Sequence, residues 1–176
     1  RNFCFFLKSI TKKRRKQFEA PKRLWDAARI KEERKLVDEY GLKNMRELWR
    51  MKTVLRKIRR EARRLQSKKG AKIEERTAAL LNRVKSFLIT DPKSLEDVLA
   101  LDTRHMLERR LQTRVVRMHL AKTMLQSRQF IAHGHVAVKG NRVSAPSYLV
   151  KFGEESLVSW YNEPIKVELE KQVNSV

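Results

Sequence analysis

The chain has 176 residues, 41% of them apolar, and carries 42 Lys and Arg against 20 Asp and Glu, for a net charge of +22 and a pI near 10.7. This composition allows one or two small cores, and a charge this large favours a nucleic-acid binder over a merely soluble basic protein. A single cysteine, Cys4, excludes a disulfide within the chain and a cysteine-based zinc cluster, and it favours a reducing, intracellular location. The apolar run at 3–7 is too short for a membrane span.

The positive charge is concentrated at the start of the chain. Residues 1–70 carry a net +17, residues 71–150 a net +7 and residues 151–176 a net −2. We therefore expect the densest contacts with a polyanion in the N-terminal half, and a tail that avoids phosphate.

Residues 1–24 predict a basic N-terminal arm, because they include the run KKRRK and a single acid, Glu19. We interpret the arm as disordered alone and ordered on RNA, rather than as a solvated tail. Its interleaved aromatics, Phe18 and the adjacent Trp25, can stack on bases or pack under the arm. The RNA contacts predicted here are Lys12, Lys13, Arg14, Arg15, Lys16, Lys22 and Arg23.

Two helices follow the arm. Asp26 can cap a helix that runs to about Tyr40, where Gly41 supplies a left-handed stop. Asn44 begins the second helix, with Glu47 as its capping-box partner. One apolar stripe of this helix consists of Leu48, Met51, Leu55, Ile58, Ala62 and Leu65. Off the stripe lie the basic residues predicted to contact RNA, which are Arg46, Arg50, Lys57, Arg60 and Arg64.

Three more helices are predicted in the middle of the chain. A third helix spans about 72–87, with Ala78, Leu80, Leu81 and Val84 as its core candidates. Ser94 and Asp97 cap a short helix at 95–101, and Asp102 caps another that leads into the next part of the chain.

Residues 109–148 combine a helix, a second helix and a hairpin. Leu111, Val115 and Met118 form a core stripe, and Arg110, Arg114 and Arg117 repeat the same spacing one residue earlier. Three aligned arginines can grip phosphates along a nucleic-acid backbone. Thr123 caps the second helix, whose N-terminus is a potential anion site, and Gly134 ends it.

The hairpin and the segments after it predict short antiparallel strands. Residues 135–138 alternate as a strand, Gly140-Asn141 is a two-residue turn signal, and Arg142-Val143 returns. Residues 148–150 and 157–160 suggest two more strands. The RNA contacts predicted in this part are Arg109, Arg110, Gln112, Arg114, Arg117, Lys122, Thr123, Gln126, Arg128, Gln129, His133, His135, Lys139, Asn141 and Arg142.

The residues do not predict a metal or catalytic site. His133 and His135 lack a nearby cysteine or carboxylate cluster, so we expect RNA or surface contacts, no metal and no cofactor. Asp91, Asp97 and Asp102 stand at helix starts, where capping explains them, and no glycine-rich phosphate loop is present. We therefore predict no catalytic residues, and we disfavour an RNA-modifying or aminoacylating enzyme that carries such a module.

Several stretches resemble a known family. The module named after ribosomal protein S-four is similar to RRLQT at 109–113, LAKT at 120–123, SRQFIAHGHVAVKGNRV at 127–143 and PSYLV at 146–150. The archaeal and eukaryotic branch of the small-subunit ribosomal protein S-four family is similar to WDAARIKEERKLVDEYGLKNMRELWR at 25–50 and LEDVLALDTRHMLERRLQT at 95–113. The resemblance covers about residues 17–162.

The resemblance implies an α+β, mostly helical fold. A basic N-terminal arm at 1–24 would precede a helical domain at 25–107 and a helix-helix-hairpin RNA-binding module with short antiparallel strands at 108–160. Residues 151–176 would form a tail that can pack near the helical domain.

The resemblance also implies a function. The chain would be a structural constituent of the small ribosomal subunit in the cytoplasm, would bind a 5′-domain junction of the small-subunit rRNA and would nucleate assembly. It would lie beside protein S-five and the channel through which messenger RNA enters, would affect decoding accuracy, and could contact messenger RNA there. We expect no membrane and no homo-oligomer. The alternative is a ribosome-assembly factor of the small-subunit processome with the same module.

Overall fold

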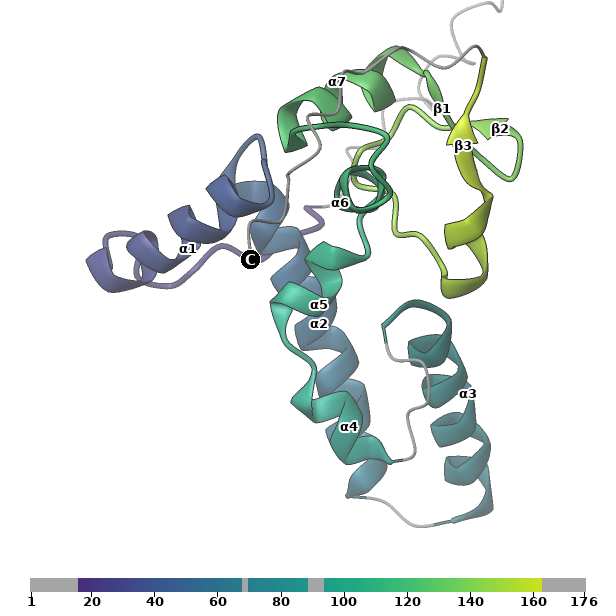
Figure 1. Cartoon of the computed structure of the whole chain (residues 1–176). Helices are drawn as coiled ribbons and strands as arrows, with labels where there is room; N and C mark the ends of the chain where they lie inside the picture. Colours follow the sequence, from purple (N-terminus) through teal and green to yellow (C-terminus); the bar gives the residue numbers. More distant parts are fainter. Residues whose placement is uncertain (1–15, 68–69, 89–93, 163–176) are drawn as a thin grey trace, which may run out of the picture.

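The computed structural model describes residues 16–67, 70–88 and 94–162, which form a helical part and a smaller module (Figure 1). The helical part contains α1 (Ala27–Glu39), α2 (Met45–Gln66), α3 (Ala71–Phe87), α4 (Leu95–Ala100) and α5 (Thr103–Glu108). The module contains α6 (Leu111–Arg117), α7 (Met124–His133), β1 (Val136–Val138), β2 (Asn141–Arg142), the 3-10 helix η2 (Phe152–Leu157) and β3 (Val158–Trp160). The prediction of a mostly helical α+β fold is confirmed.

The ends of α1 and the start of α2 follow local sequence signals. The Asp26 side chain accepts a hydrogen bond from the Arg29 backbone N–H, and Gly41 adopts a positive φ of 55° after α1. The Asn44 side chain accepts from the Glu47 backbone N–H at 3.2 Å, which confirms the predicted cap. The predicted capping box is wrong in one half, because the Glu47 carboxylate binds arginines of the module instead of the Asn44 backbone.

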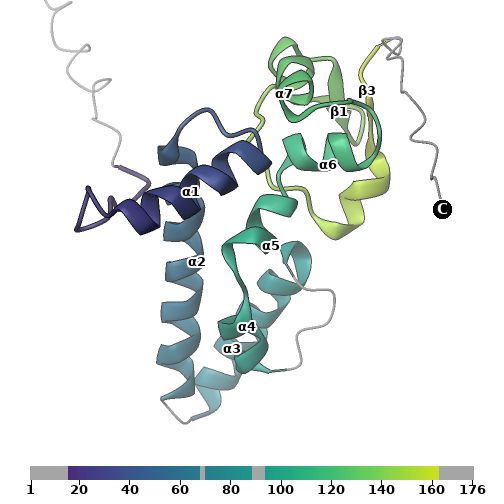
Figure 2. The same ribbon diagram turned by 60° about the vertical axis from the view of Figure 1, so that its left-hand side comes forward.

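Helix α2 is the long support of the helical part. Its predicted stripe is buried at all six positions, namely Leu48, Met51, Leu55, Ile58, Ala62 and Leu65. Helices α1, α3, α4 and α5 all contact α2, and Figures 1 and 2 show α4 and α5 stacked along its length. One face of α2 is therefore committed to the core, and a second face, around Thr53, packs against the arm and α1. The rest of its surface is left for solvent or a partner.

Helix α3 matches its predicted range to within one residue, but one of its core candidates is wrong. Leu80 and Val84 are buried and Leu81 is half-buried, whereas Ala78 is exposed. Two residues rotate the chain by about 200° on a helix, so Ala78 and Leu80 cannot face the same core. Ala78 therefore lies on the exposed face of α3, although it is apolar.

The module has its own core, separate from that of the helical part. The helical core ends along the chain at Leu107, and the module core begins at Leu111 and continues to Val158. The three strands form an antiparallel sheet in the order β2-β1-β3, with Val138 opposite Asn141 on one side and opposite Val158 on the other. Helices α6 and α7 pack together beside this sheet (Figure 1).

Two strand predictions in the module need correction. The hairpin turn consists of Lys139 and Gly140, both with positive φ, rather than Gly140-Asn141, because Val138 and Asn141 form the closing pair. Residues 148–150 do not join the sheet. Leu149 instead forms an isolated antiparallel bridge with Arg110, in the link between α5 and α6.

The segment after the module core touches both parts of the chain. Helix η2 contacts α3, and Lys151 lies over the ring of Phe87 at 5.6 Å, whereas Glu154 and Val158 are buried in the module. The rest of the predicted tail, residues 163–176, lies outside the described residues. Across the described segments, no helix is both long enough and apolar enough to cross a membrane.

Candidate nucleic-acid interface

The first candidate surface is the predicted basic side of α2. This 22-residue helix carries nine Lys and Arg and only two acids. Arg46, Lys57, Arg60 and Arg64 are exposed and have no acidic partner among the described residues, and Arg50 beside them is half-buried. Their spacing places all five within about 40° of one line along a helix about 33 Å long. Such a row of like charges disfavours the isolated helix and suits a run of phosphates.

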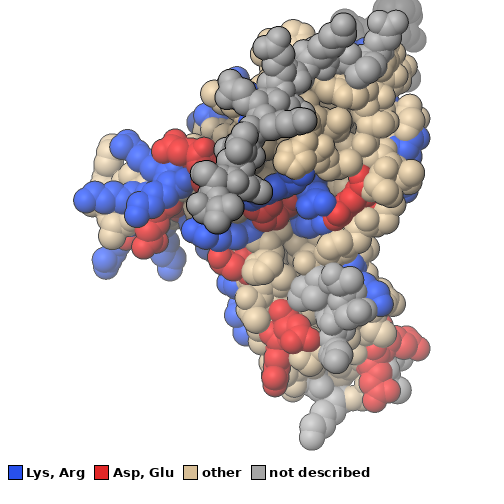
Figure 3. All heavy atoms as spheres, in the orientation of Figure 1, with Lys and Arg blue, Asp and Glu red and all other residues tan. Residues whose placement is uncertain are grey.

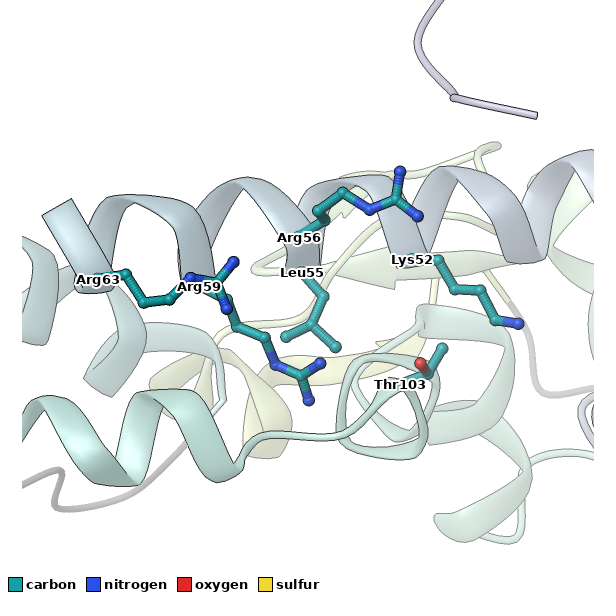
Figure 4. A pocket seen from close by; sticks show the side chains of 6 residues that line it. All are labelled: Lys52, Leu55, Arg56, Arg59, Arg63 and Thr103. Carbon is teal, nitrogen blue, oxygen red and sulfur yellow. The ribbon is translucent and has the colours of Figure 1, made fainter. Parts of the chain in front are cut away.

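A second basic face of α2 was missed by the sequence reasoning. Lys52, Arg56, Arg59 and Arg63 line a shallow pocket with Leu55 and Thr103, between α2 and the start of α5 (Figure 4). The signal was present in the sequence, because these four residues are spaced by four, three and four.

Half of the charge in this pocket is neutralised within the chain. Lys52 pairs with Glu33, and Arg56 pairs with Glu19. Arg59 donates to the Leu101 backbone oxygen, and its buried Nε has no hydrogen-bond partner. Arg63 is exposed and has no acidic partner among the described residues. The pocket can therefore accept an anion at the end formed by Arg59 and Arg63.

The described end of the basic arm is fixed against α1 and α2. The Glu19 backbone N–H donates to the Thr53 hydroxyl at 3.0 Å, and the Phe18 ring packs against Trp49 with centroids 6.0 Å apart. The arm's cations Lys16, Lys22 and Arg23 are exposed and have no acidic partner among the described residues. The other predicted arm contacts, Lys12, Lys13, Arg14 and Arg15, lie outside the described residues.

Three predicted contacts of the module are internal instead. Arg109 is 5% exposed, Arg110 is 1% exposed and Gln112 is fully buried. Arg109 donates to the Val150 backbone oxygen and pairs with Glu155. In this structure these three side chains are buried and bonded within the chain, and none of them is presented at the surface.

Gln112 instead connects the two parts of the chain. Its side-chain N–H groups donate to the backbone oxygens of Gly41, in the α1–α2 turn, and Met124, at the start of α7, at 3.0 and 2.9 Å. The Ser127 hydroxyl donates to the Gln112 backbone oxygen at 2.8 Å. Because a buried amide needs such partners, this residue fixes the position of the module relative to the helical part.

Glu47 makes a second connection between the two parts. Its carboxylate accepts from Arg110 Nη2 at 2.9 Å and from Arg128 Nη2 at 2.7 Å. Burial alone would raise the pKa of Glu47, but the Arg128 hydrogen bond and the charge of Arg110 outweigh burial and lower it. Burial also lowers the pKa of Arg110, against the attraction of Glu47, and the Nε and Nη1 of Arg110 have no hydrogen-bond partner.

In this structure the predicted stripe of Arg110, Arg114 and Arg117 is not a row of free cations, because each arginine has a carboxylate partner. Arg114 pairs with Glu155 and is partly buried, and Arg117 pairs with Glu108 at 3.0 Å. Figure 3 shows blue and red atoms side by side across the middle of the molecule. Neither arginine is free to bind phosphate unless it exchanges its carboxylate.

The remaining predicted contacts of the module fall into two groups. Gln129, His133, His135, Asn141 and Arg142 are exposed around the end of α7 and the hairpin. Arg142 among them donates to the His133 backbone oxygen at 2.8 Å. Four others are engaged within the chain. The Thr123 hydroxyl accepts from the Gln126 backbone N–H, the side-chain oxygen of Gln126 accepts from the Lys122 backbone N–H, and Lys139 pairs with Glu154. The exposed group is the part of the module that is most available to a partner.

His133 and His135 do not have the surroundings of a metal site. Their rings stack with centroids 6.3 Å apart, and His135 packs edge-on against Phe130. In the part of the chain that the structure describes, no three His, Cys, Asp or Glu side chains come together as potential metal ligands.

Comparisons with known proteins agree with this architecture. The S4 domain family matches residues 109–156. The small ribosomal subunit protein uS4 of Methanococcus aeolicus is 46% identical over 157 residues, which cover 87% of this chain and 88% of that protein. The proteins of the same name from Methanothermobacter thermautotrophicus and Halobacterium salinarum are 41% and 46% identical. Those two alignments cover 90% and 82% of this chain, and 94% and 84% of the respective relatives. The extent and level of this identity show that the chain belongs to the small ribosomal subunit protein uS4 family.

Proposed function

We propose that this chain is a structural, non-enzymatic component of the small ribosomal subunit that binds rRNA through α2, the basic arm and the exposed end of the module. The observation that carries this proposal is the identity of 41–46% to uS4 proteins over most of both chains. The basic row of α2 supports the proposal on physical grounds, because its exposed cations have no acidic partner among the described residues and a polyanion would neutralise them.

The mechanism is positioning by a rigid, charged scaffold. Phosphates displace counterions as they bind Arg46, Arg60, Arg64 and the other cations of the α2 row. The module adds Gln129, Arg142 and its neighbours at a separate location, and the Glu47 and Gln112 contacts hold the two surfaces at a set distance. Recognition then depends on the shape of a folded RNA more than on its base sequence.

The residues proposed to bind RNA differ in a defined way from those expected from the sequence. They retain the arm, the α2 row and the exposed residues around α7 and the hairpin, and they add Arg59 and Arg63 from the second face of α2. Arg109, Arg110 and Gln112 are assigned to internal support. Arg114, Arg117, Arg128 and Lys139 are assigned to ion pairs that brace the interface.

The finer placement of the chain is part of the same proposal. The RNA target is a multi-helix junction in the 5′ domain of small-subunit rRNA, bound early in assembly in the cytoplasm. The neighbours are protein S-five and the channel through which messenger RNA enters, where the chain affects decoding accuracy. A processome assembly factor would be absent from mature subunits, so one copy of the chain per mature subunit supports the ribosomal role.

The binding test compares a folded small-subunit 5′-domain RNA with an unfolded RNA of equal length, each titrated with salt. Tight binding that requires the folded junction and survives moderate salt supports the proposal. Equal binding to both RNAs, with affinity that collapses as salt rises, indicates a nonspecific polycation and contradicts it.

A further inference from the structure

Among the described residues, the least buried large apolar side chain is Trp25, which is 92% exposed at the start of α1. The other two tryptophans have internal partners. Trp49 donates to the Glu33 carboxylate and packs against Phe18, and Trp160 packs against Phe130 with ring centroids 5.3 Å apart. An exposed indole of this size loses the benefit of burial in the free protein, so its position suggests a partner that covers it.

The backbone that presents Trp25 is fixed. Arg29 Nη2 donates to the backbone oxygens of Arg23 and Leu24, both at 3.0 Å, and Arg29 Nη1 pairs with Glu33 at 2.8 Å. Glu33 is itself buried and holds Lys52 at 2.7 Å. The loop is therefore tied through Arg29 to a buried carboxylate on α1, and the indole projects from a preorganised turn.

The turn also forms a hollow beside the indole. Arg23, Leu24, Trp25, Asp26 and Ala27 line it, all from one continuous segment. In Figure 3 blue side chains extend from the projecting end of the molecule, on the left, with red side chains between them, where α1 and the chain before it lie.

The surrounding charge indicates which partner covers the indole. Lys22 and Arg23 are exposed and have no acidic partner among the described residues. The acids near them in the sequence are already engaged, since Glu19 pairs with Arg56 and Asp26 caps α1. An apolar protein surface would desolvate these cations without compensating them. A nucleotide offers both a flat base for the indole and a phosphate for the neighbouring cations.

We propose that Trp25 stacks on an unpaired nucleobase of the RNA, with Lys22 and Arg23 binding the phosphates on either side. This site rests on the proposed rRNA function and adds a base-stacking contact to a surface that otherwise contributes only charge. The Arg29 clamp makes Trp25 ready to stack, because the turn does not have to order on binding.

The test measures RNA affinity and Trp25 accessibility in the same complexes. The full chain is titrated with folded small-subunit 5′-domain RNA, as wild type and as Trp25→Ala, Trp25→Leu and Trp25→Phe. Base stacking predicts an affinity loss of about 5- to 150-fold for Trp25→Ala, nearly as large a loss for Trp25→Leu, and close to full affinity for Trp25→Phe.

Salt dependence separates stacking from charge. Trp25→Ala should leave the slope of log affinity against log salt unchanged, whereas Lys22→Ala with Arg23→Ala should reduce it by about 0.7–0.9 for each phosphate that the variant no longer binds. Acrylamide should quench Trp25 in the free protein and lose access to it in the complex, as read from the difference between wild type and Trp25→Phe. Trp160→Phe is the matched control, since that ring is half-buried and packs against Phe130.

Each outcome decides a separate point. Normal binding by Trp25→Ala, with Trp25 still open to acrylamide in the complex, overturns the stacking site and leaves the rRNA function intact. Trp25 that is protected only in whole subunits, and not by RNA alone, indicates a protein partner and also overturns it. Wild-type protein that fails to prefer the folded RNA overturns the proposed function and the stacking site together.

Discussion

The carboxylate of Glu47 joins the two parts of the chain, so its neutralisation tests how the interface is held. In Glu47→Gln, the 1%-exposed Arg110 loses its counter-charge and Arg128 loses its partner. Breaking a buried ion pair costs about 3–5 kcal/mol, and we expect about 3 kcal/mol here because the amide can still accept one hydrogen bond. The Glu47 side chain is 17% exposed, so solvent screening reduces this figure little.

The free energy of unfolding should be measured by denaturant titration followed by circular dichroism, together with the melting temperature. A loss of about 3 kcal/mol corresponds to a melting temperature lower by about 6–12 °C for a chain of this size. The matched control is Glu74→Gln, an exposed acid in the first turn of α3, which loses the same helix-dipole interaction without a buried partner.

A double-mutant cycle separates the ion pair from other effects. Arg110→Met removes the buried charge, so Glu47→Gln with Arg110→Met should be more stable than the sum of the single changes predicts, by about 2 kcal/mol. A Glu47→Gln variant within about 0.5 kcal/mol of the Glu74→Gln control, or two changes that were simply additive, would refute a stabilising role for this ion pair.

Three further predictions concern pH, a turn and the α2 row. The pKa of Glu47 is lowered on folding, so the stability that its ionised form contributes to the fold is complete above about pH 4.5 and is lost as the pH falls through the lowered pKa. Denaturant titrations from pH 6 to pH 3 should show this loss of stability, and the loss should be smaller in Glu47→Gln. In Gly41→Ala the new Cβ would lie 2.6 Å from the Cβ of Met124 in α7, at a backbone φ of +55°, and we expect the free energy of unfolding to fall by about 1–3 kcal/mol. The control Gly153→Ala, whose new Cβ would meet nothing within 4 Å, should show no measurable change. Arg60→Ala with Arg64→Ala should leave the melting temperature unchanged but lower the salt slope of RNA binding by about 1.5; an unchanged slope would remove these residues from the interface.

Local signals in the sequence determined much of the fold. The α2 stripe, the Asp26 and Asn44 caps and the left-handed Gly134 all follow from rules that operate within a few residues. Helical periodicity and capping depend on neighbours three or four positions away, so they can be predicted before the tertiary structure is known. The basic row of α2 is of the same kind, because its alignment depends only on spacing within one helix.

The tertiary structure alone decided which cations remain available. Arg60 and Arg110 have the same side chain, and both stand in basic runs, yet one is exposed and the other is buried against Glu47, 63 residues away. The sequence likewise does not distinguish Gln112 from a surface amide. The fold buries it by placing the turn at Gly41 beside it. Burial depends on which distant segment packs against a residue, and a charged side chain is free or paired according to the acid that the fold brings to it. The sequence by itself thus determined that this protein is a basic, mostly helical scaffold, and the packing of its two parts determined which of its charges face a partner.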